Sequence, residues 1–272
     1  IAYYDLGNRE AKETLVLPHG MSAWSYLYRR MIPPLINAGY RVILFDQVGC
    51  GRSDKPAKEK DYTYERHVGW NIDLLINFLK IKEGTYKVNG DIIFDNGMHV
   101  YLNPGVSLLL SSGVSLIVKG EFTSVGLDDK PIQIKSLGAN PFGTIAIHSS
   151  GEIKLKNTIV KNGSQAIING IKYSGQISIH GGKVSISKSK FLNSKGDDGL
   201  NIKRSFFDIT DSTFSGNLAD QIDIDYSEGV IERSSFIPTA KNIDGDGIDL
   251  SNSIVILKEN IISENGDKGI SI

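Results

Sequence analysis

The chain has 272 residues, of which 40% are hydrophobic and 8% aromatic, so it is long enough for one large domain or two ordinary ones. Charged residues make up 22% and nearly cancel, which excludes a disordered chain. The net charge of -1 gives no electrostatic basis for binding nucleic acid. No apolar run approaches the roughly 18 residues that a membrane-spanning helix needs. Cys50 is the only cysteine, which excludes an intrachain disulfide and a thiolate metal cage.

Composition changes sharply near residue 83. Six of the eight arginines and both tryptophans come before this point, whereas serine occurs three times before it and 25 times after it. We therefore divide the chain into a first segment, residues 1–82, and a second segment, residues 84–272. We expect the two segments to have different kinds of structure.

Strand and helix patterns alternate along the first segment. The continuous apolar runs at 14–17 and 41–45 are typical of strands that a sheet buries on both faces. Between them, residues 26–38 have a helical pattern that a Pro-Pro pair would kink or split. Residues 64–79 carry apolar side chains at the spacing of an amphipathic helix. This order of elements predicts a parallel α/β sheet.

Three motifs follow one another in the first segment. Residues 19–29 contain His-Gly and then Trp-Ser-Tyr-Leu-Tyr-Arg, and residues 45–56 read Phe-Asp-Gln-Val-Gly-Cys-Gly-Arg-Ser-Asp-Lys-Pro. Residues 61–67 read Asp-Tyr-Thr-Tyr-Glu-Arg-His. Together the motifs resemble the opening part of an α/β-hydrolase of the haloalkane dehalogenase and epoxide hydrolase branch. The Asp-Gln pair and Cys50 are also similar to the related proline iminopeptidases.

The resemblance implies an oxyanion-hole-like turn after His19, with main-chain donors at Gly20 and Met21. We expect His19 itself to orient this turn. A family member would next present a nucleophile in a Gly-x-Asp/Ser-x-Gly elbow, and this motif occurs nowhere in the 272 residues. Because oxyanion donors without a nucleophile or base cannot turn over substrate, we expect no hydrolase activity from this segment.

The second segment consists of short alternating runs separated by Gly and Asn. Two apolar positions recur along it, the first at Ile159, Phe191, Phe214, Phe236 and Ile261 and the second at Ile167, Leu200, Ile222, Ile248 and Ile270. Their spacings are 22 to 26 residues, except for an initial 32 and 33. One coil of a parallel β-helix needs about this many residues, so the segment predicts about eight coils. A β-sandwich is the alternative.

Several short units of the second segment carry a resemblance to a known family. These are Asn-Pro-Gly-Val at 103–106, Lys-Pro-Ile at 130–132, and Asp-Gly-Leu/Ile at 198–200 and 246–248. They resemble right-handed parallel β-helix proteins of the pectin-lyase-like superfamily, particularly repeat-bearing surface and secreted proteins of bacteria. The resemblance implies an architecture rather than an activity. It also implies a secreted or cell-surface protein, and since the chain begins without Met or a signal peptide, we expect its natural start to lie upstream.

Aspartates recur beside the second apolar position. They occupy the site two residues before it, at Asp198, Asp220 and Asp246, and the site one residue after it, at Asn201, Asp223 and Asp249. We expect the latter three side chains to face outward, because the apolar position faces inward. Equivalent side chains on neighbouring coils would lie about 4.8 Å apart. Stacked carboxylates at this distance raise one another's pKa or recruit a cation.

Three interpretations of this aspartate cluster stay open. The residues suit turns and keep an exposed face soluble. Alternatively, Asp223, Asp225 and Asp249 bind calcium or a glycan. In the third interpretation, polysaccharide hydrolysis or lyase chemistry uses carboxylates of the stacked face, for which the candidates are Asp197, Asp198 and Asp220. The Gly-Asp-Asp-Gly at 196–199 resembles the acid pair of polygalacturonases, although their Gly-His-Gly and Arg-x-Lys motifs do not follow it.

The sequence thus predicts a mainly β protein, a right-handed parallel β-helix preceded by a partial α/β-hydrolase segment. We expect a noncatalytic scaffold or glycan-binding surface without a cofactor, with calcium as the alternative. A polysaccharide hydrolase or lyase, and a remnant hydrolase without its catalytic half, are the other candidate functions. A polysaccharide or cell-surface glycan is the expected partner. A gene fusion, an assembly artefact and a deliberate chimera would all produce such a chain.

Overall fold

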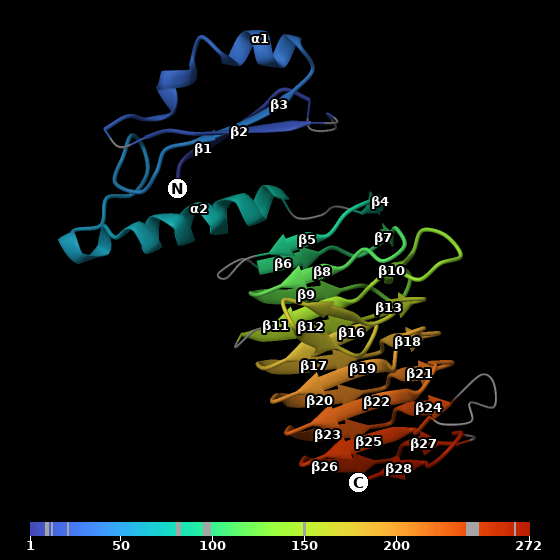
Figure 1. Ribbon diagram of the computed structural model, residues 1–272. Coiled ribbons are helices and arrows are strands. Elements are labelled where there is room, and N and C mark those ends of the chain that lie inside the picture. Colours follow the sequence, from blue (N-terminus) through green and yellow to red (C-terminus); the bar gives the residue numbers. More distant parts are fainter. Residues whose placement is uncertain are drawn as a thin grey trace. The chain divides into compact units, whose positions relative to one another are not determined.

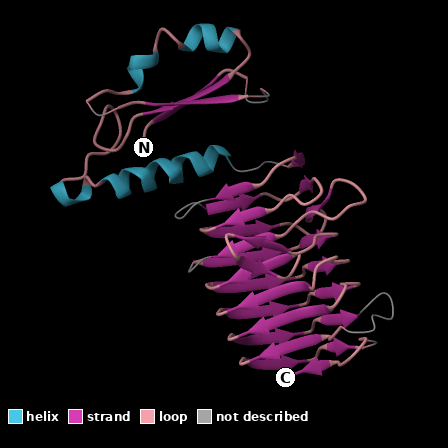
Figure 2. Ribbon diagram, viewed as in Figure 1, coloured by secondary structure: helices cyan, strands magenta, loops and turns pink. Residues whose placement is uncertain are grey.

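The computed structural model describes residues 1–8, 11, 13–20, 22–79, 83–94, 99–148, 151–237, 245–263 and 265–272. Backbone contacts divide the chain into two compact units, Ile1–Leu79 and Lys80–Ile272. Figure 1 labels the elements of both units, and Figure 2 shows that the helices belong to the first unit and that strands make up the second. No helix within the described residues is long and apolar enough to cross a bilayer.

A three-stranded sheet with the order β1–β3–β2 forms the centre of the first unit. The middle strand β3 (Arg41–Phe45) is buried along its whole length. It pairs antiparallel with β1 (Tyr3–Leu6) and parallel with β2 (Thr14–Pro18). The expected parallel pair is therefore present. The expectation that residues 14–17 are buried on both faces is wrong, because β2 is an edge strand and its residues are half-buried or exposed.

The helices of the first unit follow the sequence pattern. In place of one helix over 26–38, the 3-10 turn η1 (Ser25–Tyr28) is followed by α1 (Ile32–Asn37). The split occurs where two prolines occupy the first turn of α1, since a proline lacks the N–H that a continuing helix would need. A second 3-10 turn, η2 (Glu59–Asp61), precedes α2 (Tyr64–Leu79), which covers the predicted range.

Three parallel sheets wind around one apolar core in the second unit (Figure 1). Sheet 1 stacks β4 (Gly84–Val88), β7 (Val106–Leu110), β10 (Ile132–Ser136), β13 (Thr158–Lys161), β18 (Lys190–Leu192), β21 (Thr213–Ser215), β24 (Ser235–Ile237) and β27 (Ile261–Ile262). Sheet 2 stacks β5 (Ile92–Phe94), β8 (Leu116–Val118), β11 (Ile145–His148), β16 (Ile177–His180), β19 (Asp198–Lys203), β22 (Asp220–Asp225), β25 (Ile248–Ser251) and β28 (Ile270–Ser271). Sheet 3 stacks β6 (His99–Leu102), β9 (Glu121–Val125), β12 (Glu152–Lys156), β17 (Lys183–Ser187), β20 (Phe206–Thr210), β23 (Glu228–Glu232) and β26 (Ile254–Lys258). The predicted parallel β-helix is confirmed.

A column of apolar side chains runs through sheet 1. The rings of Phe191, Phe214 and Phe236 are fully buried and nearly parallel, with centroid separations of 4.9 and 4.8 Å. At its two ends the column continues through Val160 and Ile262. The sequence analysis placed these ends one residue earlier, at Ile159 and Ile261, and this was wrong. Successive side chains of a strand point to opposite faces, and Ile159 and Ile261 are less buried than Val160 and Ile262, so the latter two face the core.

The second predicted column is confirmed over most of its length. Leu200, Ile222, Ile248 and Ile270 occupy matching positions on β19, β22, β25 and β28. Ile167 does not belong to it. That residue lies in a hairpin formed by β14 (Ala166–Ile168) and β15 (Ile171–Tyr173), where its side chain is 76% exposed. The position on β16 opposite Leu200 is Ile177, 23 residues before it, so the spacing of 33 arose from taking Ile167, a residue of the inserted hairpin, as the column residue.

Serine is abundant in this unit because its side chains close the turns between coils. At one corner the N–H of Ser189 donates to Ser212 Oγ at 3.2 Å, and the N–H of Ser212 donates to Ser234 Oγ at 3.1 Å. Each of these serines follows a residue with a positive φ, such as Asp211 at 50°. The backbone leaves the strand at that residue, and the serine hydroxyl then satisfies an N–H of the neighbouring coil.

Shortening one ring of the column tests how much the stack stabilises the solenoid. We expect Phe214→Ala to lower the free energy of unfolding by about 3–5 kcal/mol, because it leaves a cavity in a fully packed core. Phe206→Ala is the control, since that ring is 64% exposed on sheet 3. Urea unfolding followed by circular dichroism measures both. Equal losses in the two variants would contradict a stabilising column.

Candidate functional site

The first unit retains the turn that the sequence analysis singled out. Gly20 is exposed directly after β2, and Met21 lies outside the described residues. His19 is 3% exposed, and both of its ring nitrogens are engaged. Nδ1 donates to the carbonyl of Gly20 at 2.8 Å, and Nε2 accepts from the N–H of Gln47 at 2.9 Å. His19 therefore fixes the turn to the loop after β3, as a structural residue does.

Asp46 organises the same region. Its two carboxylate oxygens accept from the N–H groups of Ser25, at 2.8 Å, and Arg52, at 2.9 Å. Burial opposes ionisation, but these hydrogen bonds prevail and hold the pKa of Asp46 below its usual value. The Asp-Gln motif thus joins three loops, and its carboxylate is fully used in doing so.

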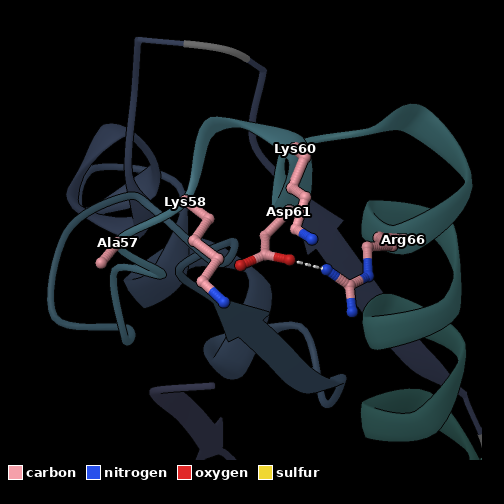
Figure 3. A pocket seen from close by; sticks show the side chains of 5 residues that line it. All are labelled: Ala57, Lys58, Lys60, Asp61 and Arg66. Carbon is pink, nitrogen blue, oxygen red and sulfur yellow. Dashed lines mark hydrogen bonds and ion pairs between the residues drawn. The ribbon is translucent and has the colours of Figure 1, made fainter.

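A polar pocket lies elsewhere in the first unit. Figure 3 shows its lining, which consists of Ala57, Lys58, Lys60, Asp61 and Arg66. The guanidinium of Arg66 pairs with the carboxylate of Asp61. None of the residues that the sequence analysis proposed for chemistry lines this pocket.

The predicted aspartate rows are present on sheet 2. Asp198 is in register with Asp220 on the next strand, and Asp223 is in register with both Asn201 and Asp249. A backbone hydrogen bond also joins two aspartates of one row, since the N–H of Asp246 donates to Asp220 Oδ1 at 2.8 Å. Equivalent residues on neighbouring strands are thus separated by about 4.8 Å, as expected.

A chain of hydrogen bonds crosses three strands on the outer side of sheet 2. His180 Nε2 donates to Asn201 Oδ1 at 3.2 Å, and Asn201 Nδ2 donates to Asp223 Oδ2 at 2.9 Å. Asn201 points away from the core as predicted, but it is not open to solvent, since it is only 1% exposed. Asp223 and Asp249 are half-buried. We call His180, Asn201, Asp223 and Asp249 the polar row. Its His180 and Asn201 end is held by hydrogen bonds, and its Asp223 and Asp249 end is accessible to solvent.

The inserted hairpin accounts for part of this burial. Tyr173 of β15 is 4% exposed, and its ring stacks on His180 with a centroid separation of 4.6 Å. The neighbouring Lys172 forms an ion pair with Asp197 at 2.8 Å. Burial lowers the pKa of His180, so the imidazole is neutral at pH 7. Sequence reasoning missed both hairpin residues, because it assigned this stretch to a strand of the regular coil.

Asp198 is the most unusual member of the rows. It is 2% exposed, and its Oδ2 has no hydrogen-bond partner. Burial raises the pKa of Asp198 well above its usual value, and the nearby Asp223 and Asp220 carboxylates raise it further. The Asp198 carboxyl therefore keeps its proton to a higher pH than an exposed aspartate does.

Asp220 and Asp223 titrate close to neutrality. Burial and then the nearby carboxylates raise the pKa of Asp220 to about 6 and that of Asp223 to about 7. The sequence analysis expected repulsion between stacked carboxylates to be the cause, whereas burial is the larger one. These two side chains can exchange protons or accept hydrogen bonds at physiological pH.

The calcium interpretation finds no preformed cage. Across the described part of the chain, no group of three or more His, Cys, Asp or Glu side chains is arranged to hold a metal ion. Asp225, one of the three candidate ligands, instead forms an ion pair with Lys203 at 2.8 Å. Asp223 and Asp249 share a register position on adjacent strands.

Comparison with known proteins separates the two units. A family model described as the α/β hydrolase fold matches residues 13–77, which lie within the first unit. This agrees with the resemblance seen in the three sequence motifs. The N-terminal segment of this chain is thus α/β-hydrolase-like.

Haloalkane dehalogenases are among the curated relatives that this chain matches. One from Psychrobacter cryohalolentis is 57% identical over 70 residues, which are 26% of this chain and 23% of that protein. One from Mycobacterium marinum is 62% identical over 71 residues, 26% of this chain and 24% of that protein. The chain therefore spans about a quarter of the length of the curated relatives it matches.

Among solved structures, a tetrameric haloalkane dehalogenase, DpaA from Paraglaciecola agarilytica, aligns with 45% of this chain and 37% of its own. The sequence identity is 24% and the TM-score is 0.28, which is too low to indicate a shared overall fold. The relationship to dehalogenases rests on the sequence matches to the first unit.

The raised pKa of Asp223 predicts a pH-dependent stability. An unfolded Asp titrates near 3.8, so the folded protein binds this proton more tightly, and the stabilisation is lost as pH rises from about 4 through about 7. We expect Asp223→Asn to gain roughly 3 kcal/mol relative to the wild type between pH 4.5 and pH 8. Urea unfolding at both pH values measures this difference. The control is Asp208→Asn, an exposed residue of β20, which should change little.

Proposed function

We propose that this chain binds an extended glycan along the outer side of sheet 2 and that its hydrolase-like segment does not turn over substrate. The observation that supports glycan binding is the polar row itself. Strands β16, β19 and β22 contribute His180, Asn201 and Asp223 to one hydrogen-bonded chain, and Asp249 continues the row on β25. A solenoid repeats such positions at a constant spacing, which suits a long ligand. A glycan partner also implies a secreted or cell-surface location.

The chemistry of the row suits hydroxyl groups. A sugar hydroxyl can donate one hydrogen bond and accept others, and the row offers ionised and neutral carboxyls as well as an amide. Asn201 and His180 are already held in place by their neighbours, so little side-chain freedom is lost when a ligand binds. Asp223 and Asp249 are half-buried and provide the accessible contacts.

The proposed inactivity of the first unit is supported by the use of its polar groups. His19 and Asp46 are both engaged in holding loops together. The sequence contains no nucleophile elbow, and the solenoid begins at β4 where the resemblance would require the nucleophile strand. A turn with oxyanion donors stabilises charge only if a nucleophile creates it.

A second candidate function, glycoside hydrolysis, is favoured by Asp198. The Asp198 carboxyl, whose pKa is raised, can give its proton to a glycosidic oxygen while the Asp220 carboxylate, in register on the adjacent strand, attacks the anomeric carbon; water then hydrolyses the resulting glycosyl ester. The bond between the anomeric carbon and the leaving oxygen breaks, and one water is consumed. We rank this second because the Asp198 carboxyl is almost completely enclosed.

Glycan binding is tested with a panel of soluble polysaccharides in affinity electrophoresis. We expect at least one polysaccharide to retard the wild-type protein, and Asp223→Asn to weaken that retardation about tenfold or more, because it removes a charged acceptor. Asp208→Asn is matched in residue type but lies on sheet 3, and it should bind like the wild type. Equal weakening by both variants would contradict a site on sheet 2.

The same panel separates binding from hydrolysis. Reducing sugar released from the bound polysaccharide, and abolished by Asp198→Asn with the fold intact by circular dichroism, would select the second candidate. Binding without product supports the noncatalytic function.

The proposed inactivity of the first unit is tested with haloalkane dehalogenation, the reaction for which its relatives are named. We expect the full chain to release no halide from a panel of short haloalkanes under conditions in which a full-length dehalogenase does. Halide release above the uncatalysed rate would show that the segment is active and would refute this part of the proposal.

A further inference from the structure

Sheet 2 carries an unusual concentration of aspartate side chains. The aspartates concerned lie on or next to β19, β22 and β25, and they are Asp197, Asp198, Asp220, Asp223, Asp225, Asp246 and Asp249. Three lysines act on them electrostatically, Lys172, Lys203 and Lys268. The chain as a whole has a net charge of only -1, so this concentration of one sign is local.

Each of these lysines is already occupied. Lys172 pairs with Asp197, Lys203 pairs with Asp225, and Lys268 pairs with Asp267, at 2.7 to 2.8 Å. Within the described ranges, the remaining five aspartates have no ion-pair partner, and these are Asp198, Asp220, Asp223, Asp246 and Asp249. Two histidines also lie on this side, His180 and, in register with it on β11, His148. His180 is neutral at pH 7 because burial lowers its pKa. The lysines near the row are thus already paired.

Asp198 adds an observation that is independent of the charge count. Its Oδ2 is buried and accepts no hydrogen bond, although the carboxyl lies within the electrostatic reach of Asp223, Asp220 and Asp197. A buried acceptor without a donor is unfavourable, because it has lost its hydrogen bonds to water. A ligand that brings hydrogen-bond donors to this group would recover that cost, whereas one that brings only acceptors would add to it.

We propose that the glycan bound along sheet 2 carries primary ammonium groups, as a polymer of deacetylated amino sugars does. An ammonium group has three donors and a full positive charge, so it can serve both the unpartnered Asp198 oxygen and the unpaired carboxylates beside it. A uronate polymer would meet like charges at every coil and is disfavoured. This inference rests on the glycan-binding function proposed above and assigns its ligand class.

A metal ion is a poorer match for the same charges. The described residues contain no group of three or more ligands arranged around one point, since the carboxylates are spread along a column rather than gathered. Regularly spaced carboxylates suit a ligand whose cationic groups are also repeated along a chain. A repeating amine-bearing glycan has this property.

The test compares three oligosaccharides of equal length by isothermal titration calorimetry in low salt at one pH, 7.0, where Asp220 is mostly ionised and Asp223 is about half ionised. These are a glucosamine hexamer, its N-acetylated form and a galacturonate hexamer. We expect the glucosamine hexamer to bind at least tenfold more tightly than the N-acetylated form and the galacturonate hexamer not to bind. Asp223→Asn should reduce the preference for the glucosamine hexamer, and Asp208→Asn should leave it unchanged. Added salt should weaken binding, because the attraction is electrostatic.

The outcomes distinguish this inference from the proposed function. Equal binding of the glucosamine and N-acetylated hexamers, with both weakened by Asp223→Asn, would overturn the ammonium inference and leave glycan binding in place. No binding of any oligosaccharide or polysaccharide would overturn both. Hexalysine that binds more tightly than the glucosamine hexamer would identify a basic peptide instead. A calcium-induced rise in melting temperature that Asp223→Asn removes would identify a metal site and also reject the inference.

Discussion

The in-register stacking of one coil on the next is the constraint on which the second unit depends. Neighbouring parallel strands are held about 4.8 Å apart by their backbone hydrogen bonds, and every side chain inherits this spacing. For Phe191, Phe214 and Phe236 the spacing is close to that of stacked rings, so the core gains aromatic contacts without distortion. For Ser189, Ser212 and Ser234 it allows each hydroxyl to reach the next coil. The same periodicity therefore explains both the core and the composition.

In-register stacking is unfavourable for charged side chains, because it holds like charges close together. Carboxylates at matching positions cannot move apart, so Asp198 and Asp220 lie on adjacent strands whatever their charge. The inserted hairpin then removes water from one end of the row through Tyr173. Burial and repulsion together raise the pKa of Asp198 well above its usual value and that of Asp223 to about 7. A polar row that would be ordinary on an open surface thus becomes a rigid site with unusual protonation.

The first unit shows how a motif can persist through its structural role. His19, Asp46 and Gln47 are specific marks of the hydrolase resemblance, and all three are used in hydrogen bonds between loops. These contacts hold the turn after β2 against the loop after β3. The motif residues stabilise the local fold of this chain through these hydrogen bonds, and this role does not require hydrolase activity.

The sequence by itself determined the architecture of both segments, since periodicity reports the strand spacing, and alternation reports which side chains face the core. It located α2, the phenylalanine column and the aspartate rows. It could not place Ile167, because an isoleucine looks the same in a hairpin as in a coil. It assigned the end of the phenylalanine column to Ile159 instead of Val160, because both neighbouring residues are apolar. Only the tertiary structure decided that Asn201 is covered, that Tyr173 stacks on His180 and that one oxygen of Asp198 lacks a partner. Burial and hydrogen bonding of this kind depend on residues from separate coils and from an insertion, and no local pattern in the chain encodes which of them come together.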